Sequence, residues 1–385
     1  MKLTILVAPD SFKDCLAAVD VAEAIASGLS QYPDINVLAM PMADGGEGTV
    51  DALVSATGGR KLKTEVIGPL GDTIMAQWAI LGDNTTAVIE MASASGLMLV
   101  PEASRNPAVT TTFGTGQLIA EAINKGCQEI IVGIGGSATN DGGLGMAQAL
   151  GVSVRDLDGH ELGYGGRELS KAVNIDISNL HPGLKNTKIK VACDVNNPLF
   201  GQRGAAYIYA PQKGAEPELV ESLDINLRHW AEVIRSELGQ DVAEVPGAGA
   251  AGGLGAGLIA FTNAQLVKGI ELVMDTLEIN RVLEKVDLVV TGEGRFDAQT
   301  ASGKVAAGLA SRAKQKNIPV VVVAGSVDMW KEAPVLGIDA VFSICKGPIT
   351  SLESMNTARE LLIYTGAQIG GLTTALLNLN NNECK

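Results

Sequence analysis

The stretch EIIVGIGGSATNDGGLG, residues 129–145, decides how the rest of this 385-residue chain is interpreted. A short apolar segment of strand-forming residues, 129–134, leads into a loop of glycine and small hydroxyl or amide residues, and the apolar segment 146–150 follows with helical character. Glycines let the backbone approach a phosphate, and exposed N–H groups at a helix start point toward it. The stretch therefore predicts an anion-binding loop; the alternative is a tight strand-to-helix turn that binds nothing.

The composition favours an α/β enzyme with more than one domain. The chain is 46% hydrophobic but only 4% aromatic, contains 46 glycines and is longer than one typical core. Its net charge of −14 argues against nucleic acid or an anionic membrane as a partner. No apolar run reaches the roughly 20 residues of a membrane span. Five widely spaced cysteines without a CxxC motif indicate reduced thiols, and we expect a cytoplasmic protein.

Strand and helix signals divide the chain into two predicted domains. Two βα units open the chain, and the same pattern returns near residue 286. This order predicts a doubly wound parallel-sheet α/β domain built from both chain ends, residues 1–61 and 284–385. Residues 62–283 form the predicted insertion, a mixed α/β domain that carries the glycine-rich loop. Within it, three alternating segments between 62 and 91 predict a small antiparallel unit.

A motif that occurs twice in the chain supports a functional role for the glycine-rich loops. Residues 44–53, DGGEGTVDAL, and residues 141–150, DGGLGMAQAL, share the pattern D-G-G-x-G-x-x-x-A-L. Residues 252–255 repeat its centre, GGLG. Several helices are thus predicted to begin alike, each with exposed backbone N–H groups; the alternative is that glycine-rich helix starts are similar by chance.

Two kinds of chemistry fit the loop. Gly133, Gly135 and Ala138 after a strand, with Asp156 about 20 residues further on, match a dinucleotide-binding pattern and an NAD-dependent hydroxy-acid oxidoreductase. However, residues 139–143 intervene before the helix, and none of the three histidines lies beside a glycine-rich loop. Phosphoryl transfer instead requires a phosphate cradle, oxygen ligands for Mg²⁺, cations and a carboxylate near the accepting hydroxyl. All of these occur at predicted strand ends, without a P-loop motif.

Five motifs, in the same order along the chain, resemble those of the bacterial glycerate kinases of the glyoxylate and sugar-diacid pathways. They are VAPDSFK (7–13), ADGGEGT (43–49), GIGGSATNDGG (133–143), DVNNPL (194–199) and TGEGRFD (291–297). Where that family usually continues Lys-Gly-Ser-Leu, this chain has KDCL at 13–16, which keeps the lysine. The resemblance implies ATP- and Mg²⁺-dependent phosphorylation of D-glycerate to 2-phosphoglycerate. The alternative product is 3-phosphoglycerate, and a sugar-acid sensor without catalysis is a further, less favoured alternative.

With this resemblance in mind, each motif receives a predicted role. The catalytic set comprises Asp194, Asp297, Lys13 and Arg295. The ATP phosphates are assigned to Gly135, Gly136, Ser137, Ala138, Thr139, Asn140 and Lys304, and glycerate to Asp10, Ser11, Lys13 and Arg295. The predicted Mg²⁺ ligands are Asp194, Asp141, Asp44 and Glu47.

Each of these roles has a structural alternative. Asp194, followed by Asn196, is the first choice as metal ligand or general base, with turn capping as the alternative and Asp297 as the competing base. Arg295 either forms a bidentate pair with the glycerate carboxylate or a structural ion pair with Glu293. Lys13 and Lys304 neutralise phosphate charge or are solvated surface lysines. Helix capping is the alternative for Asp10, Asp44, Glu47 and Asp141.

Overall fold

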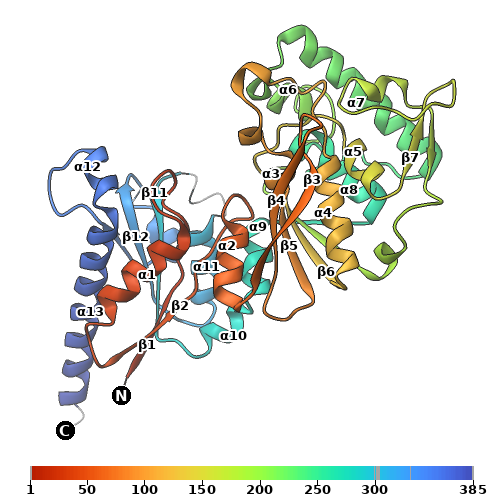
Figure 1. Cartoon of the computed structure of the whole chain (residues 1–385). Coiled ribbons are helices and arrows are strands. Elements are labelled where there is room, and N and C mark those ends of the chain that lie inside the picture. Colours follow the sequence, from red (N-terminus) through yellow and green to blue (C-terminus); the bar gives the residue numbers. More distant parts are fainter. Residues whose placement is uncertain (1, 299, 301–303, 330, 384–385) are drawn as a thin grey trace. The chain divides into compact units, whose positions relative to one another are not determined.

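The chain forms two compact units in the computed structural model, which describes residues 2–298, 300, 304–329 and 331–383 (Figure 1). Unit 1 comprises residues 1–44, 51–57 and 270–385, and unit 2 comprises residues 45–50 and 58–269. The predicted fold class is therefore confirmed: an α/β unit from both chain ends receives a mixed α/β insertion. The predicted boundaries, 61/62 and 283/284, differ from the observed ones because residues 270–283 pack with unit 1 and residues 45–50 with unit 2.

Unit 1 is organised around a five-stranded, all-parallel sheet. Its strand order is β13-β12-β11-β1-β2. The central strands are continuous apolar runs because both of their faces are buried. The strands are β1 (Leu3–Val7), β2 (Ile35–Ala39), β11 (Leu288–Phe296), β12 (Val320–Val327) and β13 (Ala340–Ser343).

Helices complete unit 1, and the longest of them packs along α1 (Figure 1). Gly28 of α1 and Gly366 of α13 meet the partner helix's backbone so closely that a Cβ at either position would collide with it. Small residues therefore set the distance between these two helices. The helices are α1 (Ala18–Leu29), α2 (Thr49–Thr57), α9 (Gly269–Thr276), α10 (Ile279–Leu283), α11 (Val305–Lys314), α12 (Ser351–Asn356) and α13 (Ala358–Glu383), the first residues of α2 and α9 lying in unit 2.

Unit 2 is built on a six-stranded mixed sheet of order β10-β9-β6-β5-β4-β3. Strands β5, β6, β9 and β10 run parallel, whereas β3 and β4 pair antiparallel. The predicted antiparallel pairing of the segments between residues 62 and 91 is confirmed, and these strands form one edge of the main sheet because β5 also pairs with β6. The strands are β3 (Arg60–Ile67), β4 (Thr73–Ile80), β5 (Thr86–Glu90), β6 (Glu129–Gly133), β9 (Lys188–Ala192) and β10 (Gln265–Val267).

A second hydrophobic cluster lies beside this sheet in unit 2 and centres on Trp230 of α7. The indole nitrogen of Trp230 donates to the carbonyl of Gly142 (3.1 Å), which connects this cluster to the glycine-rich loop. The remaining elements are α3 (Ala92–Ser95), α4 (Phe113–Asn124), α5 (Leu144–Ala149), α6 (Ala205–Tyr209), α7 (Pro217–Leu238), α8 (Ala250–Thr262) and the two-stranded sheet of β7 (Ser153–Arg155) and β8 (Asn174–Asp176).

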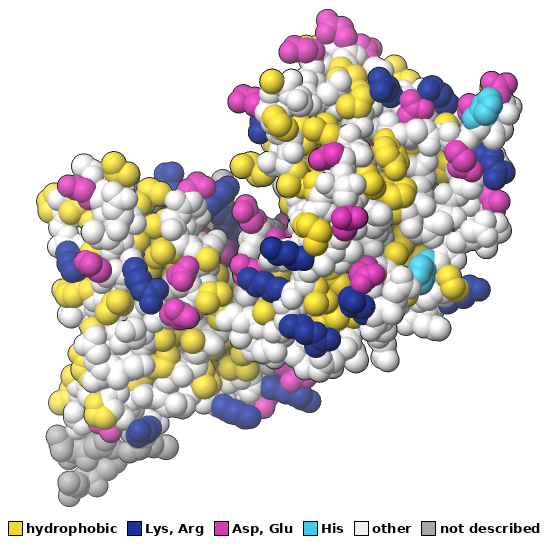
Figure 2. Space-filling model, in the orientation of Figure 1, with side chains coloured by type: hydrophobic (Ala, Val, Ile, Leu, Met, Phe, Trp, Pro, Cys, Tyr) yellow, Lys and Arg dark blue, Asp and Glu magenta, His cyan; other side chains and the backbone are white. Residues whose placement is uncertain are grey.

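The surface is mixed in character. Acidic, basic and apolar side chains are interspersed over the face seen in Figure 2. Among the described residues, no helix is both long and apolar enough to cross a membrane.

Candidate functional site

The glycine-rich loop leaves the carboxyl end of β6, within the parallel part of the unit 2 sheet. Gly135 and Gly136 are exposed, whereas the predicted cradle residues that follow them, 137–140, are buried. The amide of Ala138 donates to the carbonyl of Ser95 (3.0 Å), and the carbonyl of Gly136 accepts from the amide of Leu97 (2.8 Å). The loop is therefore held from one side, and only its glycine tip is open to a ligand.

Buried polar side chains hold the loop from beneath. Thr110 Oγ1 donates to the carbonyl of Ala138 (2.8 Å). Lys213 Nζ donates to Ser137 Oγ (2.7 Å) and to the carbonyl of Thr139 (2.6 Å). Sequence reasoning missed Lys213; the signal available was a lysine three residues after the apolar, alanine-rich segment 205–210. The loop is thus fixed before any ligand binds.

Two residues of the predicted cradle carry unsatisfied polar atoms. Thr139 Oγ1 and both side-chain amide atoms of Asn140 are buried and have no hydrogen-bond partner among the described residues. Such atoms are rare in folded proteins, because an unmade buried hydrogen bond costs about 1–3 kcal/mol. Their concentration in one loop fits a site that is completed by a ligand or by ordered water.

Asp141 is fully buried at the end of the loop. Its Oδ2 accepts from the amide (2.8 Å) and hydroxyl (2.8 Å) of Thr112 and from the amide of Gly145 (3.3 Å), and its Oδ1 accepts from the amide of Gly143 (3.2 Å). Burial raises the pKa of Asp141, and these hydrogen bonds oppose that rise. The carboxylate thus connects the starts of α4 and α5, which favours the capping alternative over metal ligation.

The second glycine-rich loop lies against the first in unit 2. A Cβ on Gly133 would lie 2.7 Å from the carbonyl oxygen of Gly45, and one on Gly45 would collide with Ala192. Gly45 also has φ +90°, which favours glycine. The amide of Val50 donates to Glu90 Oε1 (2.8 Å) at the end of β5. Residues 45–50 of the second loop therefore lie beside the start of the first, at the carboxyl ends of the parallel strands of this sheet.

Asp194 lies at this same edge, just after β9, and is exposed. Its Oδ1 accepts from the amide of Gly269 (3.0 Å), directly after the exposed Lys268 that follows β10. Asn196 is exposed as well, whereas Asn197 is engaged with the carbonyl of Arg203 (2.7 Å). Sequence reasoning missed Lys268 because the three-residue strand β10 gives too short a signal.

Unit 1 holds a separate group of carboxylates at the carboxyl ends of β1 and β11. The amide of Asp10 donates to the carbonyl of Gly292 (2.8 Å), which places Asp10 beside Glu293. Glu293 Oε1 accepts from Thr300 Oγ1 (2.8 Å). Burial, followed by the charge of Asp44, raises the pKa of Asp10 to about 7. Burial raises the pKa of Glu293 to about 7 as well. Sequence analysis considered Glu293 only as an ion-pair partner.

Lys304 is the nearby cation in this group. It precedes α11, and its charge lowers the pKa of both Asp10 and Glu293, although burial outweighs it at each carboxyl. Ser11 donates its amide to Asp10 Oδ1 (2.6 Å). Lys13 is exposed in the turn that follows. Asp10, Asp44, Glu293 and Lys304 thus form one electrostatically coupled cluster.

Arg295 is two-thirds exposed and pairs with Asp328, not with Glu293. Its Nε and Nη2 both approach Asp328 Oδ2 (2.8 and 2.6 Å), and Asp297 Oδ2 lies 3.6 Å from Nε. These carboxylates raise the pKa of Arg295, led by the hydrogen bond to Asp328. The ion-pair alternative is therefore realised with a different partner, and the guanidinium is held in one orientation on the β11–β12 edge.

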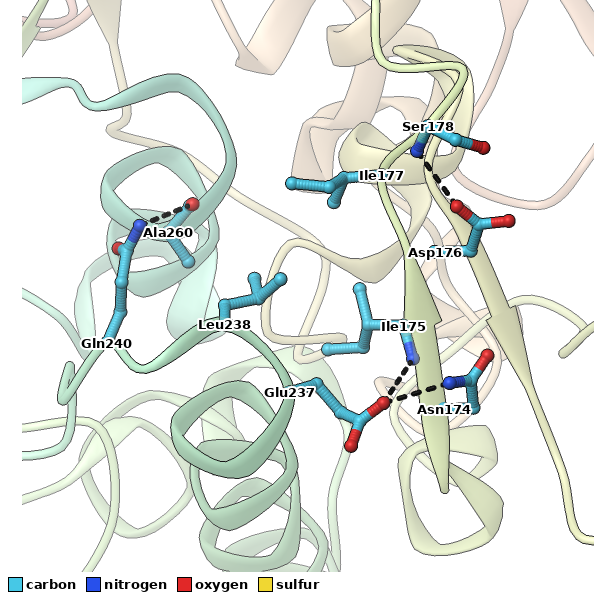
Figure 3. A pocket seen from close by; sticks show the side chains of 9 residues that line it. All are labelled: Asn174, Ile175, Asp176, Ile177, Ser178, Glu237, Leu238, Gln240 and Ala260. Atoms are coloured by element: carbon cyan, nitrogen blue, oxygen red, sulfur yellow. Dashed lines mark hydrogen bonds between the residues drawn. The ribbon is translucent and has the colours of Figure 1, made fainter.

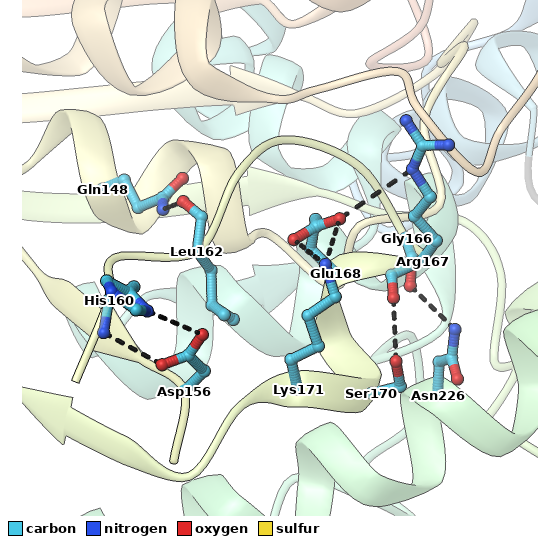
Figure 4. Close-up of polar contacts among 10 residues, drawn as sticks. All are labelled: Gln148, Asp156, His160, Leu162, Gly166, Arg167, Glu168, Ser170, Lys171 and Asn226. Atoms are coloured by element: carbon cyan, nitrogen blue, oxygen red, sulfur yellow. Dashed lines mark hydrogen bonds and ion pairs between the residues drawn. The ribbon is translucent and has the colours of Figure 1, made fainter. Parts of the chain in front are cut away.

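The dinucleotide-binding alternative does not fit this fold. Strand β7, which precedes Asp156, pairs with β8 in a separate two-stranded sheet and not with β6. Asp156 instead organises a turn: its Oδ1 accepts from the amides of Asp158 (3.0 Å) and His160 (2.9 Å). Figure 4 shows its contacts with His160. Asp156 therefore does not follow a strand that pairs with β6, as a dinucleotide-binding fold requires.

A groove elsewhere in unit 2 does not contain these residues. It has a volume of about 740 Å³ between β8 and the end of α7 (Figure 3). Its carboxylates are used internally: Glu237 Oε2 accepts from Asn174 Nδ2 (2.9 Å), and Asp176 Oδ1 accepts from the amide of Ser178 (2.8 Å). We therefore assign the functional site to the strand ends rather than to this groove.

Comparison with known proteins shows what this chain is similar to. Residues 5–374 match the model of the glycerate kinase family. A glycerate kinase from Halalkalibacterium halodurans is 49% identical, covering 93% of this chain and 95% of its own. A glycerate 2-kinase from Escherichia coli K12 is 50% identical, covering 92% and 93%. A crystal structure from Salmonella typhimurium LT2, assigned as glycerate kinase 2, has a TM-score of 0.91 at 47% identity and covers 98% of this chain and all of its own.

The pKa of Glu293 predicts a pH-dependent stability. Because its folded-state value exceeds the ordinary 4.5, the folded protein binds more protons than the unfolded chain between pH 4.5 and about 7. Stability is thus lost as the pH rises through this window, by up to about 3 kcal/mol from this group. Glu293→Gln keeps an acceptor for Thr300, so the variant should gain stability relative to the wild type at pH 8 but not at pH 5. Denaturant unfolding at both pH values measures this.

The exposed Glu65 provides the control, because Glu65→Gln should follow the wild type at both pH values. An equal change in stability of Glu293→Gln and the wild type between pH 5 and pH 8 would contradict the prediction.

Proposed function

The chain belongs to the glycerate kinase family, and from that premise we propose that it transfers the γ-phosphoryl group of ATP to D-glycerate, giving 2-phosphoglycerate and ADP. As a glycerate kinase it is a phosphotransferase with an alcohol acceptor. Support for the 2-position is the 50% identity to the E. coli protein named glycerate 2-kinase. The observation that carries the proposal is the fixed glycine-rich loop, whose tip is exposed at one strand end, with Asp194 exposed at the end of the neighbouring strand.

In this proposal the unit 2 edge binds the nucleotide. Gly135 and Gly136 offer backbone without side chains, as phosphate-binding loops do. Ser137 supplies a hydroxyl, and the nucleotide or ordered water completes the unsatisfied side-chain atoms of Thr139 and Asn140. Lys268 places a positive charge at the same edge.

Magnesium would be held by carboxylate oxygens, the ligands that it prefers. Asp194 and Glu47 are exposed acids of unit 2, and Asp44 immediately precedes the second glycine-rich loop. When bound, the ion would neutralise charge on the nucleotide phosphates. Asp141 keeps the capping role described above, because its oxygens already accept four hydrogen bonds.

The unit 1 cluster binds glycerate in this proposal. Arg295, oriented by Asp328, pairs with the substrate carboxylate, and Ser11 and Lys13 complete the binding groups. Lys304 keeps its predicted role of neutralising phosphate charge. Asp10 and Glu293 have pKa values of about 7, the range in which a general base works best near neutral pH. They join Asp194 and Asp297 as groups able to accept the proton of the glycerate hydroxyl.

An assay of ADP release tests the function directly. The purified protein, ATP and Mg²⁺ should release ADP with D-glycerate and much more slowly with lactate or L-glycerate. Phosphorus NMR of the product separates 2-phosphoglycerate from 3-phosphoglycerate. Turnover with NAD and no ATP would instead support the oxidoreductase, and glycerate binding without ADP release would support a sensor.

Asp194→Asn tests the acid at the end of β9. Asparagine keeps the Oδ1 that accepts from Gly269, so the loop retains its conformation, while the negative charge is lost. We expect kcat to fall by at least about 100-fold, because both metal ligation and general-base catalysis need the carboxylate. The exposed Asp241→Asn is the matched control and should keep wild-type turnover. Near-normal kcat in Asp194→Asn would exclude both roles.

Arg295→Ala tests the proposed ion pair between Arg295 and the glycerate carboxylate. We expect KM for glycerate to rise about tenfold or more while KM for ATP stays near the wild-type value, since only one substrate loses a charge-assisted pair. Asp328→Asn leaves the guanidinium present and is the control, with a smaller effect on KM for glycerate. If both variants change KM for glycerate equally and slightly, Arg295 is only a surface ion pair.

A further inference from the structure

Lys213 is a lysine whose side chain is almost completely buried, with 1% of the residue exposed. It ends a short 3₁₀ turn, Pro211–Lys213, after which Gly214 has φ +92°. A Cβ on Gly214 would collide with the carbonyl of Arg105, so the chain here is fixed by close packing. The turn therefore directs the Lys213 side chain into the interior of unit 2, beneath the glycine-rich loop.

The hydrogen bond from Lys213 to Ser137 determines the orientation of the Ser137 hydroxyl hydrogen. In its charged form the Lys213 ammonium only donates hydrogen bonds, so with Lys213 protonated Ser137 Oγ accepts from Nζ at 2.7 Å. The hydroxyl hydrogen of Ser137 must then be directed to some other acceptor. None is present among the described residues, and the exposed Gly135 and Gly136 directly precede Ser137 in the chain.

We propose that Lys213 is a positioning residue for the nucleotide: by donating to Ser137 Oγ it directs the Ser137 hydroxyl hydrogen toward an anionic oxygen bound beside Gly135 and Gly136. Its second hydrogen bond, to the carbonyl of Thr139, fixes the backbone of the same loop. This inference rests on the proposed function only in taking a nucleotide phosphate as the anion. It concerns the binding of ATP and not the identity of the acceptor.

A purely structural role explains this lysine less well. Burial lowers the pKa of Lys213 to about 7, and the charge of Asp141 only partly opposes that effect. Replacing a buried charged group with an apolar side chain of similar size is often neutral or stabilising. If Lys213 only filled space, methionine would therefore replace it without loss. If Lys213 orients the Ser137 hydroxyl, methionine cannot replace it.

A double-mutant cycle on ATP affinity tests the proposal. The full-length protein is titrated calorimetrically with ATP and Mg²⁺, without glycerate, as wild type, Ser137→Ala, Lys213→Met and the double variant. We expect each single variant to weaken ATP binding about tenfold or more, the loss typical of a hydrogen bond to a charged group. The double variant should be no weaker than the weaker-binding single variant, because both changes remove one interaction.

Control variants separate this role from folding and from general charge effects. Ser137→Thr keeps the hydroxyl and should bind ATP within about threefold of the wild type. Lys171→Met removes an exposed lysine that pairs with Glu168 in the same unit and should leave affinity unchanged. Thermal unfolding of each variant reports on the fold.

Three results would overturn the inference: unchanged affinity in Ser137→Ala, unchanged affinity in Lys213→Met, or losses that multiply in the double variant. If Lys213→Met does not fold, Lys213→Leu, which also lacks a hydrogen-bond donor, replaces it in the cycle, and Ser137→Ala remains decisive by itself. Coupled losses of ATP affinity in a protein that does not phosphorylate glycerate would support the positioning role while refuting the proposed function. Glycerate phosphorylation without coupled losses of ATP affinity would support the proposed function while refuting the positioning role.

Discussion

The buried carboxylate of Asp141 is the interaction on which the glycine-rich loop depends. Through Thr112 it binds the residue that precedes α4, and through Gly143 and Gly145 it binds the start of α5. Two helix starts thus share one negative charge, an arrangement that helix dipoles favour. A glycine-rich segment loses more backbone entropy on folding than any other kind. The loop is ordered because Asp141, Thr110, Lys213 and Trp230 hold it at several points.

Close backbone packing supplies the second constraint on this region. Gly133 lies against Gly45, and Gly252 lies against Thr139 so closely that a side chain at either position would collide. Residues 251–253 have left-handed backbone conformations at the start of α8, and the carbonyl of Gly252 accepts from the amide of Gly142 (3.0 Å). Many of the glycines around the loop therefore serve packing, and only the exposed Gly135 and Gly136 remain for a ligand.

Local patterns in the sequence were sufficient to predict most of the fold. Continuous apolar runs such as 3–8 and 287–291 predicted parallel strands, and the order of βα units predicted a domain from both chain ends. The sheet membership of β3–β5 could not be predicted, because hairpin signals specify neighbours along the chain but not the pairing of β5 with β6. Strand β10 was missed because three residues give no periodicity.

The site was predictable in its loops but not in its buried partners. Motif positions located Asp194, Gly135 and Arg295 at strand ends, since those features are local. Lys213 contacts residues more than 70 positions away and Arg295 pairs with Asp328, and no local pattern encodes such distances. The same limit applies to Glu293, whose raised pKa arises first from burial. Burial and long-range pairing depend on tertiary structure. The pKa and the partners of a side chain are therefore determined only when the chain has folded. Burial is the main cause that shifts the pKa of Lys213 and of Glu293 to about 7, although their residue types alone do not distinguish them from surface charges.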